Sequence, residues 1–297
     1  MITIPDLQTA LLDLLYEVQG ADIRLIIGGG FGIYLKADYV RRLGAPTLFR
    51  EWPEARSTND LDLFLRPELL IQSAKLKPLA EAIARLGYKV VRGAEKYQFM
   101  KLGPGGAQAG SVKIDILTGP QSRFEGTRVK TDTRRARPDP SVGIHAHPVD
   151  EVPTLEEGLL PETLNGKLSS GEPWQAEVFL PQPYTFLMMK LFAFKDRLND
   201  ANKEFGRYHA LDMYTILATT METEWKHALE LRHQYGDDPY IMEAGRLVLK
   251  HFSALDHPGM IRLRESPYYR PGLQLDEFMS ALKELFPARA ETDSEGN

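Results

Sequence analysis

The sequence predicts an α+β protein in which a strand-rich part with flanking helices precedes a C-terminal helical bundle. Up to about Pro173 the 297-residue chain is rich in glycine and in short aliphatic runs, which are typical of buried strands. From Pro183 onward, apolar residues recur at helical spacing, and the prolines here mark a joint. We therefore expect a first domain over residues 1–180, a helical domain over 181–288 and a disordered tail over 289–297.

Composition and charge exclude several classes of protein. The chain is 43% hydrophobic and 26% charged, as in ordinary globular proteins. Its net charge of -5 argues against general coating of nucleic acid but permits a local basic patch. Without cysteine there is no disulfide, thiolate metal site or cysteine nucleophile. No apolar run reaches the roughly 18 residues that span a bilayer, and the first residues lack a secretory signal pattern. We expect a cytoplasmic protein with no membrane contact.

The first expected elements are a helix, a short strand and a glycine turn. Leucines at helical spacing predict a helix from Pro5 to Val18, and the run Ile23 to Ile27 predicts a buried strand. The strand leads directly into Gly28-Gly29-Gly30-Phe31-Gly32, and a helix is expected from Ile33 to Leu43. Backbone N–H groups at such a helix start can hold a phosphate, and glycines let it approach. A tight strand-to-helix turn without a ligand also needs glycine.

Two acidic residues interrupt the next apolar strand, Thr58 to Leu65. Asp60 and Asp62 are two residues apart and therefore share one face, whereas Leu61 and Leu63 point to the other face, into the core. Buried carboxylates are costly unless they are paired or bind a metal. The pair suggests a hard cation, Mg²⁺ or Mn²⁺. The alternative is a strand end whose acids are solvated or pair with arginines.

A third acid lies among aliphatic residues further along the chain. After the glycine-rich connection Gly103 to Gly110, an expected strand from Val112 to Leu117 carries Asp115. If this strand neighbours the strand of Asp60, three carboxylates meet and repel one another strongly. Bound divalent cations would neutralise them, so the combination predicts a metal site.

Three other segments carry weaker signals. Gly44 to Ser57 is interpreted as a surface excursion, and Gly119 to Pro140 as an irregular, locally basic segment. The basic segment is either a solvated loop or an electropositive lip for a triphosphate or an RNA backbone. His145 and His147 alternate on an expected strand, but no third ligand is in sight, so we do not expect zinc. The basic residues of the second segment are Arg123, Arg128, Lys130, Arg134, Arg135 and Arg137.

The helical part places charged residues on two of its expected helices. Lys190 and Arg197 are seven residues apart and share a helix face, and His209 and Asp212 are neighbours on the next helix. A lysine on an apolar helix surface is costly unless it reaches an anion such as a triphosphate or extends to solvent. Asp212 would orient Lys190 or Arg197, contact an acceptor, or form a structural salt bridge. The expected helices are Pro183 to Leu198, His209 to Leu217, Trp225 to Tyr235, Tyr240 to Leu255 and Leu275 to Phe286.

The assembled pattern resembles the nucleotidyltransferase superfamily, whose catalytic core is polymerase-β-like. The resemblance lies in a glycine pair that opens a helix, a D-x-D strand and a third acid on a later strand. In this sequence these residues are Gly29, Gly30, Asp60, Asp62 and Asp115.

The helical part also resembles the AbiEii-type toxins of bacterial type IV toxin–antitoxin systems. That family has a proline-led helix with a lysine, matched by Pro183 to Lys190, and then a basic and acidic helix, matched by Arg207 to Asp212. The chain departs from the family in the long gap at Gly44 to Ser57 and in His209, where the toxins often have aspartate.

The resemblance implies a nucleotidyltransferase-type mixed β-sheet with flanking helices, followed by the helical bundle, and a two-metal site. Asp60 and Asp62 would hold the Mg²⁺ or Mn²⁺ ions, and Asp115 would bind the ion that activates the acceptor and act as base. The implied catalytic residues are Asp60, Asp62, Asp115 and Lys190. The implied nucleotide-binding residues are Gly29, Gly30, Lys190, Arg197 and Asp212.

The implied activity is transfer of a nucleoside monophosphate from an NTP to an acceptor hydroxyl, with pyrophosphate released. In an AbiEii-like toxin the acceptor would be tRNA or another translation component, and the partner would be a DNA-binding antitoxin protein. One alternative is an antibiotic nucleotidyltransferase with an aminoglycoside or lincosamide acceptor. Another is a non-catalytic nucleotide-binding module.

Overall fold

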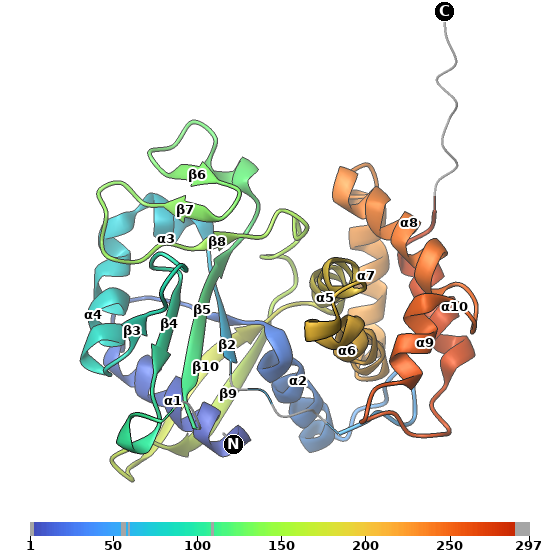
Figure 1. The fold of residues 1–297 in the computed structure, drawn as a ribbon, viewed down its shortest axis with the longest axis horizontal. Helices are drawn as coiled ribbons and strands as arrows, with labels where there is room; N and C mark the ends of the chain where they lie inside the picture. The colour runs from blue at the N-terminus through green and yellow to red at the C-terminus, as the bar shows by residue number, and fades with distance from the viewer. Residues whose placement is uncertain (1–2, 55–57, 59, 108–109, 289–297) are drawn as a thin grey trace, which may run out of the picture. The chain divides into compact units, whose positions relative to one another are not determined.

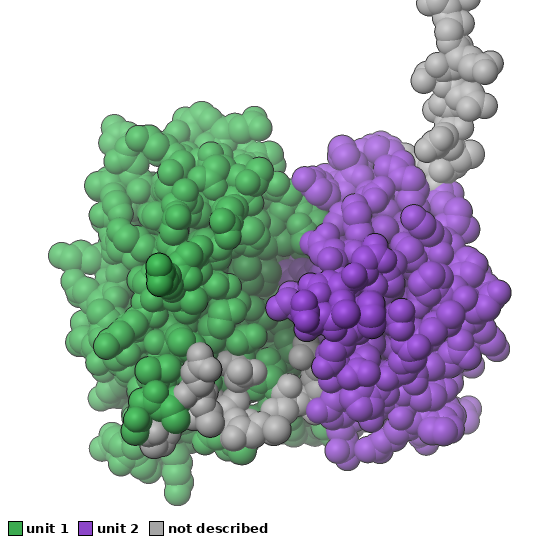
Figure 2. Space-filling model, in the orientation of Figure 1, with its two compact units in different colours: residues 1–43, 55–182 green, residues 44–54, 183–297 purple. Residues whose placement is uncertain are grey.

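The computed structural model describes residues 3–54, 58, 60–107 and 110–288. The chain divides into two compact units (Figure 2). The described residues of the first unit fall within 1–43 and 55–182, and those of the second unit fall within 44–54 and 183–297. Residues 44–54, which belong to the predicted first domain, thus group with the second unit. The predicted disordered tail, 289–297, lies outside the described residues.

A mixed β-sheet forms the centre of the first unit (Figure 1). Its described strands are β1 (Ile26–Ile27), β2 (Asp60–Leu65), β3 (Lys89–Val90), β4 (Gln98–Lys101), β5 (Val112–Thr118), β8 (His147–Pro148), β9 (Leu160–Lys167) and β10 (Pro173–Leu180). They follow the order β3-β4-β5-β2-β1-β10-β9, with β8 beside β5. The pairs β1–β10, β2–β5 and β5–β8 are parallel, and the other pairs are antiparallel. The predicted α+β class with a mixed sheet is confirmed.

Four α-helices flank this sheet in the described part of the first unit: α1 (Ile4–Glu17), α2 (Gly29–Leu43), α3 (Pro67–Ile71) and α4 (Lys77–Arg85). Helix α1 begins with a capping box in which Thr3 and Asp6 bond each other's backbone N–H groups. Its leucines recur at helical spacing, and Leu7 and Leu11 are fully buried. Leu61 and Leu63 are fully buried as predicted.

Two strand-rich segments differ from the prediction. The segment Gly119 to Pro140, expected to be irregular, contains the hairpin β6 (Lys130–Asp132) and β7 (Arg135–Arg137). A side-chain turn closes it, because Asp132 accepts a hydrogen bond from the backbone of Arg134 at 2.9 Å. Strand β10 is longer than the expected Val178 to Leu180, since it pairs along its whole length with β9. Because both strands carry many polar residues on their exposed faces, the sequence does not indicate their full length.

The second unit is helical. Its described α-helices are α5 (Pro183–Arg197), α6 (Arg207–Ala218), α7 (Glu222–Gln234), α8 (Pro239–Phe252), α9 (Pro258–Arg264) and α10 (Leu275–Leu285). Aromatic side chains fill the core: the ring centroids of Phe194 and Phe252 lie 5.0 Å apart, and those of Tyr184 and Phe286 lie 4.9 Å apart. The C-terminal helical region is confirmed, with α9 as an additional helix. Among the described residues no helix has the length and apolar character needed to cross a membrane.

Residues 44–54 belong to this helical unit through specific contacts. Leu48 donates a backbone hydrogen bond to Thr220 at 3.0 Å, and the backbone N–H of Arg50 donates to the side chain of Gln274 at 2.8 Å. Phe49 is buried against Tyr214, with ring centroids 5.3 Å apart. The segment lies at the surface as expected, with most of its residues at least partly exposed, but it is fixed to the helical unit by these contacts.

Candidate functional site

The three predicted metal acids lie on one face of the central sheet. Strands β2 and β5 are parallel neighbours, and their register pairs Asp62 with Asp115 and Asp60 with Lys113. Residues paired across a ladder share a face, as do residues two apart on one strand. Asp60, Asp62 and Asp115 thus come together from two segments distant in sequence, at half-buried positions.

A lysine that the sequence analysis did not single out lies among these acids. The Nζ atom of Lys113 lies 2.8 Å from Oδ2 of Asp115. Burial acts to lower the pKa of Lys113, but the hydrogen bond and charge of Asp115, with the charges of Asp60 and Asp62, outweigh burial and raise it. Its position two residues before Asp115, between aliphatic residues, was the signal that could have revealed it.

The carboxyl of Asp115 is electrostatically unfavourable in this setting. Burial is the main cause that raises its pKa from 3.8 to about 6, the charges of Asp62 and Asp60 add to the rise, and the hydrogen bond from Lys113 opposes it. Because the folded state holds this proton more tightly than the unfolded state, stability contributed here is lost as the pH rises from about 4 to about 6. A carboxylate that costs stability at neutral pH is typical of a functional site.

The glycine turn makes room for one of the acids. Helix α2 begins at Gly29, which has a φ of +60°. A Cβ atom at Gly29 would overlap Oδ2 of Asp62 and lie 2.7 Å from its Cγ atom. The backbone N–H of Gly28 donates to the carbonyl of Asp62 at 2.8 Å, which fixes the start of α2 beside β2. The helix starts four residues earlier than predicted, so Gly29 and Gly30 form its first turn, where backbone N–H groups lack intrahelical acceptors.

The acids do not form a closed ligand cage. Across residues 3–54, 58, 60–107 and 110–288, no set of three acidic or histidine side chains is arranged to hold one metal ion. One oxygen of Asp115, Oδ1, is buried without a hydrogen-bond partner among these residues. The geometry therefore brings the predicted acids to one face, and their role as metal ligands stays a prediction.

The other predicted site residues belong to the helical unit. The Nζ atom of Lys190 on α5 lies 2.7 Å from Oδ2 of Asp212 on α6, and both side chains are less than one tenth exposed. Arg197 contacts Nε2 of His209 between the same two helices. The interhelix pairing of Lys190 with Asp212 is the structural salt bridge that the sequence left open. The nucleotide-binding and catalytic roles of Lys190, Arg197 and Asp212 stay predictions.

Removing one member of this buried pair should be costly. We expect Lys190→Met to reduce the free energy of unfolding by about 3–5 kcal/mol, because Asp212 loses its buried ion-pair partner. The double variant Lys190→Met/Asp212→Leu should lose less. Urea unfolding measures both, with Lys226→Met as the control, since Lys226 pairs with Glu222 on the surface and should matter little. Equal effects of Lys190→Met and Lys226→Met would contradict the account.

The basic segment is largely engaged in ion pairs. Arg123 contacts Glu156 at 3.1 Å and Glu68 at 3.6 Å, and the hairpin arginines Arg135 and Arg137 both contact Asp132 at 3.4 Å. Such pairs favour a structural role over an electropositive lip. The Nδ1 atom of His147 bonds the carbonyl of Arg134 at 2.9 Å.

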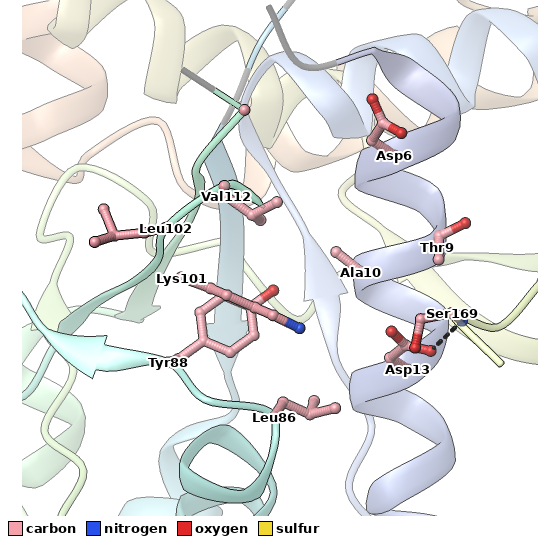
Figure 3. Close-up of a pocket in the computed structure, with 12 residues that line it drawn as sticks. Asp6, Thr9, Ala10, Asp13, Leu86, Tyr88, Lys101, Leu102, Val112 and Ser169 are labelled. Atoms are coloured by element: carbon pink, nitrogen blue, oxygen red, sulfur yellow. Dashed lines mark hydrogen bonds between the residues drawn. The ribbon is translucent and has the colours of Figure 1, made fainter. Parts of the chain in front are cut away.

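A separate cavity of about 510 Å³ lies on the opposite face of the sheet (Figure 3). Residues of α1 form one wall, and Tyr88, Lys101 and Val112 contribute to the other. Asp13 in this wall accepts a hydrogen bond from the backbone of Ser169 at 2.9 Å. Val112 alternates with Lys113 along β5, so the cavity and the acids are on different faces. None of the predicted site residues lines it.

Comparison with known proteins finds weak structural similarities to solved structures. The sequence matches no protein-family model and shows no significant match to a curated protein. A solution structure of the antibiotic-resistance factor ANT(2'')-Ia is similar at 14% identity and a TM-score of 0.36, covering 79% of this chain and all of that one. A crystal structure of ANT(2'')-Ia in complex with adenylyl-2''-tobramycin is similar at 14% identity and a TM-score of 0.35, covering 77% of this chain and 98% of that one. Similarity at this level is too weak to establish a shared substrate or reaction.

Proposed function

We propose that this protein is a metal-dependent nucleotidyltransferase that moves a nucleoside monophosphate from an NTP to an acceptor hydroxyl. The observation that carries the proposal is the register of β2 and β5, which places Asp60, Asp62 and Asp115 on one sheet face. The start of helix α2 lies beside Asp62. Acids that bind cations and a helix start that binds phosphate are the two parts that this reaction needs.

The residues of this face fit a divalent cation. Carboxylate oxygens are the ligands that Mg²⁺ and Mn²⁺ prefer, and the unpartnered Oδ1 of Asp115 is an acceptor that a cation would satisfy. Asp60 and Asp62 would hold the metal together with the triphosphate, and Asp115 would face the acceptor. The bound metal would supply neutralisation of the charge that develops on the phosphate oxygens.

The residues of this chain would position the reactants. Gly29 and Gly30 would donate backbone N–H groups to the β- and γ-phosphates, since they form the first turn of α2, where N–H groups have no acceptor within the helix. Asp115, with a pKa of about 6, would accept the proton of the acceptor hydroxyl at neutral pH. The reaction would then be an in-line displacement at the α-phosphorus, with pyrophosphate leaving.

This proposal has two more specific versions, which differ in the acceptor molecule. One version is an AbiEii-type toxin with a tRNA acceptor and a DNA-binding antitoxin, as the sequence resemblance implies. The other is the antibiotic alternative, which has a counterpart in ANT(2'')-Ia, at a similarity too low to carry an argument. Growth of cells that express the wild-type protein or Asp62→Asn distinguishes them: toxicity lost in the variant supports the toxin, and drug resistance lost in the variant supports the antibiotic enzyme.

Incubation with α-labelled NTPs tests the proposed reaction itself. ATP, CTP, GTP and UTP are supplied with Mg²⁺ and, in separate samples, total cell RNA or aminoglycosides and lincosamides. We expect label to reach one acceptor class in a Mg²⁺-dependent way. Asp22→Asn is a matched control, because Asp22 is an exposed acid of the same unit. Nucleotide binding that requires Mg²⁺ but yields no product on any acceptor would instead favour the non-catalytic module.

Metal binding should strengthen as the pH rises through the pKa of Asp115. A proton on Asp115 removes a negative charge beside Asp60 and Asp62, so the increase in melting temperature caused by Mn²⁺ should be larger at about pH 8 than at about pH 5. The Asp115→Asn variant should lose most of this pH dependence. The same Mn²⁺-induced shift at both pH values in the wild-type protein would show that the charge of Asp115 does not contribute to metal binding.

A further inference from the structure

The ammonium group of Lys113 lies where a metal ion bound to Asp115 would place its positive charge. Its Cα is paired with that of Asp60 across β2 and β5, and it lies two residues before Asp115 on one strand, so all three side chains share a face. The contact of Nζ with Oδ2 of Asp115, at 2.8 Å, joins side chains that are only 28% and 16% exposed. A partly desolvated ion pair of this kind is not easily exchanged for solvent.

Lys113 leaves one position for a cation on this face. Asp115 is turned toward Lys113, whose Nζ atom lies 2.8 Å from Oδ2 of Asp115. In the described part of the chain the acids and histidines form no cluster of three that could hold an ion. Asp60 and Asp62, two residues apart on β2 and therefore on one face, are the remaining carboxylates of the site at which one ion can bind.

We propose that Lys113 takes the place of a second metal ion, so that the acid face binds one divalent cation, at Asp60 and Asp62, together with the nucleotide. Lys113 is then a positioning residue that neutralises Asp115 and fixes its orientation toward the acceptor. The inference rests on the proposed function, because it specifies how many metal ions that reaction uses here. It replaces the two-metal arrangement that the sequence resemblance implies.

The number of bound Mn²⁺ ions tests this inference. Paramagnetic resonance counts the ions per chain in the presence of saturating α,β-methylene analogues of the NTPs, which bind without being cleaved. We expect about one ion in the wild-type protein and in Lys113→Arg, which keeps the charge, and about two in Lys113→Met. Lys101→Met is the matched control, since Lys101 lines the cavity on the other face of the sheet, and its count should stay at about one.

The outcomes separate this inference from the proposed function. Two ions in the wild-type protein, or equal counts in wild type and Lys113→Met, would overturn the role of Lys113 alone. If Asp62→Asn does not reduce the number of bound ions, the proposed function is overturned as well. If Lys113→Met does not fold, the wild-type and Lys113→Arg counts still decide, because two ions in either one contradict the inference.

Discussion

Replacement of Asp62 by asparagine should reduce NMP transfer by about 10³-fold or more while the protein stays folded. Asp62 lies between Asp115 on the neighbouring strand and the start of helix α2. Its carboxylate would therefore hold the metal ion next to the position of the phosphate. Positioning and charge neutralisation supply most of the acceleration in phosphoryl-type transfer, and asparagine removes the charge while nearly keeping the shape. Steady-state transfer of labelled nucleotide measures the loss.

Two comparisons make this result specific. The Asp22→Asn variant should keep full activity, since its carboxylate is exposed and Asp22 lies outside the strands of the sheet. The melting temperature of Asp62→Asn without metal should not fall, because removing one of several mutually repelling acids relieves strain in the face. Activity retained within a few-fold in Asp62→Asn would remove the basis for the catalytic assignment.

Gly29→Ala should abolish transfer and lower stability together. Alanine at a φ of +60° costs about 1–2 kcal/mol. In addition, its Cβ would overlap the carboxylate of Asp62, so that either the helix start or the acid must move. A displacement of about 1 Å at such a site is enough to cost about 100-fold in rate. Kinetics and thermal unfolding of the same preparation measure both effects.

The control for Gly29→Ala is Gly44→Ala. Gly44 has almost the same backbone conformation, with a φ of +62°, but a Cβ there meets no atom within 4 Å. Gly44→Ala should therefore show the backbone cost without a loss of activity. If both variants lose activity alike, the contact between Gly29 and Asp62 does not explain the loss.

The acids could be predicted from sequence because each stands out from its strand. Asp60, Asp62 and Asp115 alternate with aliphatic residues, and alternation fixes the face of a side chain regardless of what surrounds it. That β2 and β5 are parallel neighbours in this register required the fold, since no local pattern specifies which strands pair. Lys113 obeys the same alternation, but a pattern of acids alone does not include the positive charge that pairs with Asp115.

Other features depended on contacts that a local pattern does not contain. Residues 44–54 join the helical unit through backbone hydrogen bonds to residues far along the chain, such as Thr220 and Gln274. Strand β9 has polar residues on its exposed face, and one of its two buried residues, Glu162, is itself charged, so the alternation of apolar and polar residues is weak. The structure adds that Gly29 makes room for Asp62, which the sequence did not indicate, and the phosphate contact of Gly29 stays a prediction.

A crystal structure with Mn²⁺ and a non-cleavable NTP analogue tests the central claim most directly. The account predicts anomalous density within about 2.0–2.2 Å of carboxylate oxygens of Asp60 and Asp62, with the triphosphate at the start of helix α2. Mn²⁺ and nucleotide bound elsewhere, with this sheet face unchanged, would contradict it.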